Sequence, residues 1–303
     1  MGPRDSEPFR RSRIQLYSRL KLKNIFPGEW ESVYTGDGIE FMGIKPFEPG
    51  DDVRDLDLYT LVRSGEEEII ERSVGRQLRV FIWADLSGSL QKSEAAFFPA
   101  KREIRDNAIG MLAFSAWNAY SPVGLCAFDR EIRKFFPAGP GESYCREIMD
   151  WVLDQEYTNP VPVDVPKAIA FLMERGFPQS LVFFISDFQD PVFEDDFSDL
   201  IKPAAEKFDL ITVVIRDPLE TDATLPRSAI LSVSGDEGSG GRTIYLTPRK
   251  LREIQKVSAG HLSHLERNFR RAGINHVVLD SPSLEHCYES LSGLFQARRR
   301  APL

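Results

Sequence analysis

The stretch Val80-Phe-Ile-Trp-Ala-Asp-Leu-Ser-Gly-Ser89 decides the fold that we expect for this chain. It begins with an apolar run without polar alternation, which is typical of a β-strand buried on both faces. Asp85, Ser87 and Ser89 follow at alternate positions where the strand ends. Hard divalent ions such as Mg²⁺ prefer oxygen ligands, and a short loop can direct these three side chains at one ion. Because one carboxylate and two hydroxyls form an incomplete shell, the motif favours a docking site over a cleavage site.

Two further runs, at 181–185 and 210–215, are apolar throughout, and helical sequences separate them. This alternation predicts an α/β fold with a doubly wound, mostly parallel sheet covered by helices on both faces. In such sheets ligands gather at the carboxyl ends of the strands. Asp85, Asp187 and Asp217 each follow one of these strands, so the three carboxylates are candidates to meet in space. The pattern predicts strands at 78–84, 123–128, 132–136, 181–185, 210–215 and 275–279, and helices at 101–119, 143–153, 165–175, 197–207, 248–272 and 283–295.

Turn signals and periodicity divide the chain into two regions. Residues 1–75 are rich in turn signals and show little helical periodicity, which predicts an irregular or β-rich N-terminal region. Residues 76–303 carry the alternating strands and helices of the α/β domain. At about 217–246 the alternation is interrupted by two short β-like runs around a glycine-rich turn, and we expect an inserted β-hairpin there.

Composition narrows the function classes. The formal net charge of −8 gives no support to general nucleic-acid binding, which depends on a dense basic surface. No apolar run approaches the roughly 18 residues that a membrane span requires, and no signal peptide is visible. We therefore expect a cytoplasmic protein without an integral membrane segment. Cys126, Cys145 and Cys287 are widely separated and odd in number, which favours reduced, packed thiols.

The Asp85-x-Ser87-x-Ser89 motif at the end of a buried strand resembles the metal-ion-dependent adhesion site of von Willebrand factor A domains, which have a Rossmann-like fold. The resemblance implies that these three residues contact the ion directly. It also implies that Asp187, which follows the strand at 181–185, supplies the further aspartate that usually reaches the ion through water. The cofactor would be Mg²⁺, with Mn²⁺ or Ca²⁺ as the other candidates.

Five ordered motifs narrow the resemblance. They are Tyr34-x-Gly-x-Gly-x-Glu-Phe-x-Gly, Pro49-Gly-Asp-Asp-Val-Arg-Asp-Leu-Asp with Arg63 and Gly65 after it, Asp187-Phe-x-Asp, Asp217-Pro-x-Glu and Leu225-Pro226. Together they resemble the bacterial family called domain of unknown function 58, which joins such an N-terminal segment to a von Willebrand A-like domain. The resemblance implies proteins often encoded beside MoxR-type AAA+ ATPases. It implies that they act with that ATPase, and with a client protein, in chaperone-like assembly or maturation of protein complexes.

One position departs from the adhesion-site pattern. The pattern draws a threonine from the loop before a helix, and Val163 stands in the best-matching segment here. Valine offers no oxygen. Either Thr158 or Asp164 replaces the threonine, or the ion is held weakly or not at all.

We expect a non-enzymatic, metal-dependent protein-interaction module. The alternative is a divalent-metal hydrolase in which Asp85, Asp187 and Asp190 hold an ion that activates water. That alternative lacks a general base, because all four histidines lie in the last fifth of the chain, far from these motifs in sequence. A third possibility is a purely structural scaffold whose site Val163 has disabled.

Overall fold

The computed structural model describes residues 14, 41–48, 56–65, 67–72, 78–90, 101–155, 163–175, 180–193, 197–224, 229–233 and 242–300. The chain forms two compact units. The smaller is Pro27–Gln77, and the larger combines Met1–Phe26 with Leu78–Leu303.

The smaller unit contains an antiparallel pair of strands, β1 (Phe41–Pro46) and β2 (Glu68–Arg72), and a short helix, α2 (Leu58–Ser64). The sequence did not predict α2. Its seven residues are too few to display a helical period, and a local cap starts it: the Asp57 carboxylate accepts hydrogen bonds from the backbone N–H and the hydroxyl of Thr60. Residues 34–40 and 49–55, which carry much of the N-terminal motif, lie outside the described residues.

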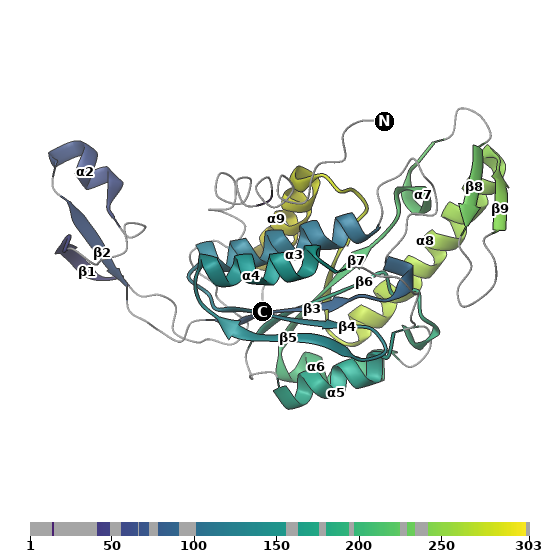
Figure 1. The fold of residues 1–303 in the computed structure, drawn as a ribbon, viewed down its shortest axis with the longest axis horizontal. Helices are drawn as coiled ribbons and strands as arrows, with labels where there is room; N and C mark the ends of the chain where they lie inside the picture. Colours follow the sequence, from purple (N-terminus) through teal and green to yellow (C-terminus); the bar gives the residue numbers. More distant parts are fainter. Residues whose placement is uncertain are drawn as a thin grey trace. The chain divides into compact units, whose positions relative to one another are not determined.

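The larger unit is built on a six-stranded sheet with the strand order β10-β7-β6-β3-β4-β5 (Figure 1). Every neighbouring pair is parallel except β4 and β5, which form an antiparallel pair at one edge. The predicted α/β fold with a mostly parallel sheet is thus confirmed. The strands are β3 (Val80–Asp85), β4 (Val123–Phe128), β5 (Ile132–Gly139), β6 (Leu181–Ser186), β7 (Asp209–Ile215) and β10 (Asn275–Leu279).

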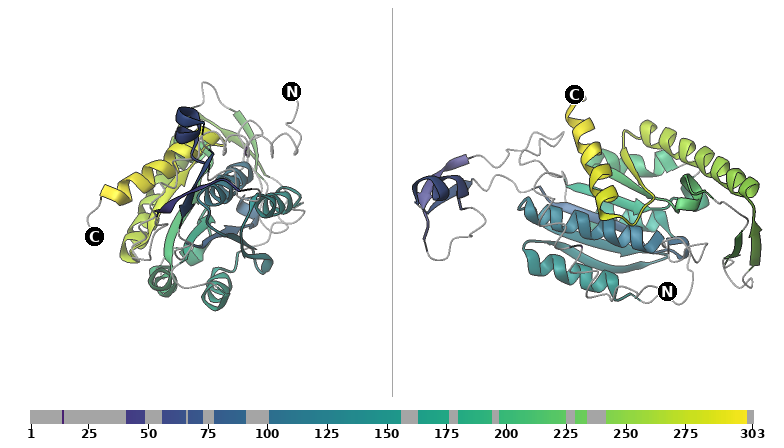
Figure 2. Two further views of the ribbon diagram at one scale, coloured as in Figure 1. Left: turned by 90° about the vertical axis from the view of Figure 1, so that its left-hand side faces the viewer. Right: turned by 90° about the horizontal axis from the view of Figure 1, so that it is seen from above.

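Helices cover both faces of this sheet. One face carries α3 (Lys101–Asn118), α4 (Glu142–Leu153) and α9 (Leu284–Arg300), and the right-hand view of Figure 2 looks onto it. The opposite face carries α5 (Val165–Arg175), α6 (Phe197–Lys207) and α8 (Pro248–Arg271). The three central strands β3, β4 and β6 are buried along their whole length, which explains why their sequences show no polar alternation.

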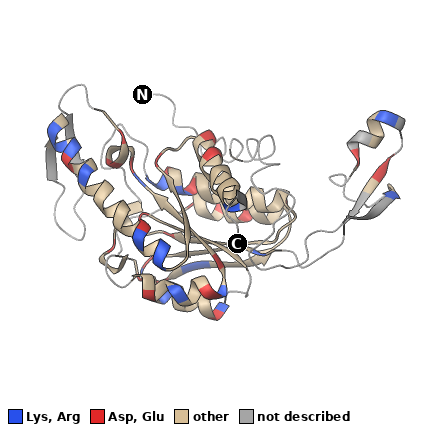
Figure 3. Ribbon diagram, turned by 180° about the vertical axis from the view of Figure 1, so that it is seen from behind, with Lys and Arg blue, Asp and Glu red and all other residues tan. Residues whose placement is uncertain are grey.

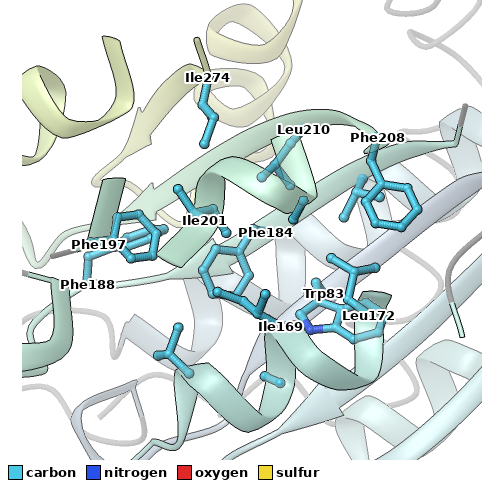
Figure 4. Close-up of a cluster of buried hydrophobic side chains, with 14 of the residues drawn as sticks. Trp83, Ile169, Leu172, Phe184, Phe188, Phe197, Ile201, Phe208, Leu210 and Ile274 are labelled. Atoms are coloured by element: carbon cyan, nitrogen blue, oxygen red, sulfur yellow. The ribbon is translucent and has the colours of Figure 1, made fainter. Parts of the chain in front are cut away.

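The core on the α5, α6 and α8 face is dominated by aromatic side chains (Figure 4). Trp83 and Phe184 reach it from the sheet, and Phe197 reaches it from α6. Phe188, two residues beyond the end of β6, packs edge-on against Phe184 and Phe269, with its ring centroid 5.5 Å and 5.4 Å from theirs. A close-packed aromatic cluster on this face of the sheet therefore holds the carboxyl end of β6 in place.

The β-hairpin predicted at about 217–246 is present in its second part, as β8 (Ala229–Val233) and β9 (Arg242–Leu246). Its first part is instead a short helix, α7 (Pro218–Thr221), which Asp217 caps by accepting a hydrogen bond from the backbone N–H of Leu219. The first turns of α8 follow the hairpin and contain four basic residues, which belong to the blue segments of this helix in Figure 3: Arg249, Lys250, Arg252 and Lys256. No helix of the described residues is both long enough and apolar enough to cross a membrane.

Candidate functional site

The candidate site lies where the neighbouring strands β3 and β6 end. The two strands pair in parallel with Ala84 opposite Ile185, so Asp85 and Ser186 leave the sheet side by side. The Ser186 hydroxyl donates to Asp85 Oδ2 at 2.6 Å, and the backbone N–H of Ser87 donates to Asp85 Oδ1 at 2.7 Å. Both oxygens of this almost fully buried carboxylate are thus fixed in direction by the chain around them.

The two serines of the motif lead from this buried carboxylate to the surface. The Oγ atoms of Ser87 and Ser89 lie 3.1 Å apart, Ser87 is buried, and Ser89 is exposed. The turn Gly88–Leu90, which contains Ser89 and directly follows Ser87, is anchored by the buried side chain of Leu90. Three of the predicted ligand residues are therefore arranged on one short loop, with the open side of the site at Ser89.

Asp187 follows directly after β6 and is buried. Its Oδ1 accepts from the backbone N–H of Gln189 at 3.3 Å, and its Oδ2 accepts from Lys101 at 3.2 Å. The next residue, Phe188, has a positive φ of 54°, which is uncommon for a residue other than glycine. Burial of the Phe188 ring in the aromatic cluster offsets that backbone cost, so core packing fixes the turn that presents Asp187.

The pKa of Asp85 shows how the site is balanced electrostatically. Burial and the neighbouring charge of Asp187 raise the pKa of Asp85 from its ordinary 3.8 to about 6, although hydrogen bonds from Ser186 and Ser87 act in the opposite direction. Two carboxylates held close together in a buried place disfavour full ionisation unless a positive charge joins them. A cation at the site would supply that charge.

The structure already supplies one cation, which the sequence analysis did not single out. Lys101, the first residue of α3, is buried, and its Nζ lies 3.2 Å from Asp187 Oδ2 and 2.8 Å from Glu220 Oε1. Glu220 lies on α7 and also faces Arg216, with Arg216 Nη1 3.6 Å from Glu220 Oε2. The sequence does offer a signal for Lys101. A lysine in the first turn of a predicted helix is disfavoured by the helix dipole, which indicates that anionic side chains lie close to it.

The other candidate carboxylates have local roles. Asp164 Oδ1 accepts from the backbone N–H of Lys167 at the start of α5, and Asp190 Oδ1 accepts from the backbone N–H of Val192. Each carboxylate stabilises a turn or helix start, as Asp217 does at α7. Asp164 and Asp190 each bond to a backbone N–H two or three residues further along the chain, so these hydrogen bonds do not join them to Asp85.

The adhesion-site threonine position is only partly described. Val163 packs against the core cluster, in agreement with its apolar character, and Thr158 lies outside the described residues. The backbone N–H of Asp164 donates to the carbonyl of Asp129 at the end of β4, 3.0 Å away. Because β4 neighbours β3 in the sheet, the chain before α5 reaches the same edge as Asp85.

The chemistry of the donors fits a hard divalent cation. Asp85, Ser87 and Ser89 offer one carboxylate and two hydroxyls, and Asp187 lies on the adjacent strand end. Within the described ranges, no three side chains of His, Cys, Asp or Glu are grouped so that they could hold a metal ion. A metal at this place would therefore depend on the serine hydroxyls and on water for most of its shell.

The fold and the site define an α/β protein in which polar side chains gather where parallel strands end. The chain belongs to the family described as Protein of unknown function DUF58, whose model matches residues 43–280. This confirms the resemblance to the domain of unknown function 58 family.

Two similar proteins are the uncharacterized protein Rv1480 of Mycobacterium tuberculosis and the uncharacterized protein Mb1516 of Mycobacterium bovis. Each is 21% identical over 262 residues, which is 86% of this chain and 80% of the relative. Among solved structures, an aerotolerance-related membrane protein from Bacteroides fragilis is 14% identical, with a TM-score of 0.43 over 71% of this chain and 99% of that chain.

Proposed function

We propose that this protein is a non-enzymatic, metal-dependent interaction module that acts in the cytoplasm with a MoxR-type AAA+ ATPase in the assembly or maturation of protein complexes. Asp85, Ser87 and Ser89 would hold the ion directly, and Asp187 would act on it from the neighbouring strand end. When bound, a Mg²⁺ or Mn²⁺ ion supplies a positive charge whose coordination is still open to an outside carboxylate.

The observation that carries the proposal is the arrangement of Asp85. Its two oxygens are oriented by Ser186 and Ser87, and the hydroxyls of Ser87 and Ser89 lie 3.1 Å apart, with Ser87 buried and Ser89 exposed. The carboxylate is thus preorganised at the buried end of the site, and Ser89 lies at its exposed end. This geometry supports docking of a partner's acidic side chain at the exposed end.

The local roles of the remaining carboxylates also favour binding over hydrolysis. Asp190, which the hydrolase alternative needs as an ion ligand, has an oxygen committed to the backbone of Val192. His261 Nδ1 contacts Arg216 Nη2 at 3.0 Å, and Arg216 in turn faces Glu220. These contacts assign neither residue to the activation of water.

The test is a titration of the MoxR-type ATPase against the full chain, in Mg²⁺ and in excess chelator. We expect the affinity to fall in chelator and to fall to the same level in Mg²⁺ when Asp85 is replaced by Ala. Asp222→Ala, which removes an exposed carboxylate at the end of α7, is the matched control and should bind like the wild type. Equal affinity in all of these conditions would remove the metal from the mechanism.

A further inference from the structure

Lys101 occupies an unusual position for a lysine. It is the first residue of α3, where the positive end of the helix dipole disfavours a cation, and its side chain is only 6% exposed. Lysine is almost never buried to this extent unless it is paired. The residue therefore needs a compensating environment, and its contacts show what that environment is.

Two carboxylates from two different strand connections meet the Lys101 ammonium group. Asp187 Oδ2 lies at 3.2 Å and Glu220 Oε1 at 2.8 Å. Burial alone would lower the pKa of Lys101, but the charges of Asp187 and Glu220 together raise it above its ordinary value. The side chain is thus a permanent ammonium ion held between the end of β6 and helix α7.

The same Asp187 directly follows Ser186, whose hydroxyl donates to Asp85 Oδ2 at 2.6 Å where the paired strands β3 and β6 end, and its charge is one of the causes that raise the pKa of Asp85. Asp187 therefore has two electrostatic roles. It neutralises Lys101 on one side, and it contributes negative charge to the proposed ion site on the other. Any divalent ion that draws on Asp187 meets the positive charge of Lys101 next to it.

We propose that Lys101 is a built-in cation of this site, which competes with a divalent ion for the charge of Asp187 and so sets how tightly the ion is held. This inference rests on the proposed function, because it concerns the same ion site. Its consequence is a weak resident ion that exchanges readily, which suits a site that engages and releases a partner. A second consequence concerns α7. Because Lys101 also pairs with Glu220 on that helix, a change in the Lys101–Asp187 contact would also change the Lys101–Glu220 contact.

The test measures Mg²⁺ binding to the full chain by isothermal titration calorimetry, for the wild type and for Lys101→Met. Removing the positive charge should tighten Mg²⁺ binding by about tenfold or more, because Lys101 Nζ lies 3.2 Å from Asp187 Oδ2 and a buried like charge opposes a cation that draws on the same carboxylate. Lys101→Arg keeps the charge and should bind Mg²⁺ within about threefold of the wild type. Lys202→Met removes an exposed lysine of α6 and should leave the affinity unchanged.

Thermal unfolding with and without millimolar Mg²⁺ gives a second measurement. Loss of Lys101 leaves Asp187 and Glu220 without their shared cation, so Lys101→Met should be less stable than the wild type and should gain more stability from Mg²⁺. Folding of Lys101→Met in Mg²⁺ only would support the inference. If Lys101→Met folds in neither condition, Lys101→Gln, which is uncharged but keeps a hydrogen-bond donor, takes its place with the same expectations.

The outcomes separate this inference from the proposed function. Tighter binding by Lys101→Met than by a wild type that also binds Mg²⁺ supports both. Binding by Lys101→Met alone supports the role of Lys101 and overturns a metal-dependent function for the native chain. Equal or weaker binding by Lys101→Met overturns the role of Lys101 and leaves the proposed function standing. If neither protein binds Mg²⁺, both are overturned.

Discussion

The raised pKa of Asp85 predicts an unusual dependence of stability on pH. Its folded-state pKa of about 6 lies above the ordinary value of 3.8, so the folded protein binds the proton more tightly than the unfolded chain does. The stabilisation is therefore complete below pH 3.8 and is lost as the pH rises through 6. The difference between about 6 and 3.8, at 1.36 kcal/mol for one pKa unit, corresponds to about 3 kcal/mol.

Urea unfolding of the wild type and of Asp85→Asn, measured from pH 4.5 to pH 7 without divalent ions, isolates this contribution. Linkage with these two pKa values predicts that the stability of the wild type relative to Asp85→Asn falls by about 2 kcal/mol over that range. Asp222→Asn, which removes the charge of an exposed carboxylate, is the matched control. Addition of Mg²⁺ at pH 7 should restore part of the loss in the wild type and in Asp222→Asn but not in Asp85→Asn, because the ion favours the ionised Asp85 carboxylate. A difference that stays constant from pH 4.5 to 7 would refute the reasoning.

Three further predictions concern the sheet, the last helix and the absence of turnover. Gly124→Ala should destabilise the protein by about 1–3 kcal/mol in urea unfolding, because the added Cβ would lie 2.7 Å from the backbone oxygen of Phe136; Gly260→Ala, where nothing lies within 4 Å, should not destabilise it. Arg298→Ala should lower the free energy of unfolding by about 1–2 kcal/mol, since Arg298 Nη2 lies 2.8 Å from both carboxylate oxygens of Asp209 in a half-buried ion pair that connects α9 to β7. An unchanged free energy of unfolding would show that this pair does not contribute to stability. A screen of phosphatase and phosphodiesterase substrates with Mg²⁺ and Mn²⁺ should give no turnover above background. Metal-dependent turnover that is abolished in Asp85→Asn would instead favour the hydrolase alternative.

The sheet could be predicted from the sequence because its strands carry a strong local signal. The uninterrupted apolar runs of β3, β6 and β7 can belong only to strands or segments buried on all sides, and their short lengths favour strands. The same reasoning missed α2 and α7, whose few residues show no period and whose starts depend on the single capping carboxylates Asp57 and Asp217.

The site was predictable only in part for a related reason. An aspartate after a strand looks the same in sequence whether it faces an ion or caps a turn, and the structure gives Asp164 and Asp190 the second role. Lys101 escaped notice because its partners Asp187 and Glu220 lie 86 and 119 residues further along the chain, and only the fold brings them together. Contacts of that kind depend on the order of the strands, which local patterns do not encode.

The most direct measurement is an anomalous difference map from crystals of the full chain soaked in Mn²⁺. The proposed function predicts a single strong peak at the ends of β3 and β6, within coordination distance of Asp85, Ser87 and Ser89, and its loss in crystals of Asp85→Ala. A map with no peak between these side chains, in crystals where Asp85 and Asp187 keep the positions described above, would contradict it.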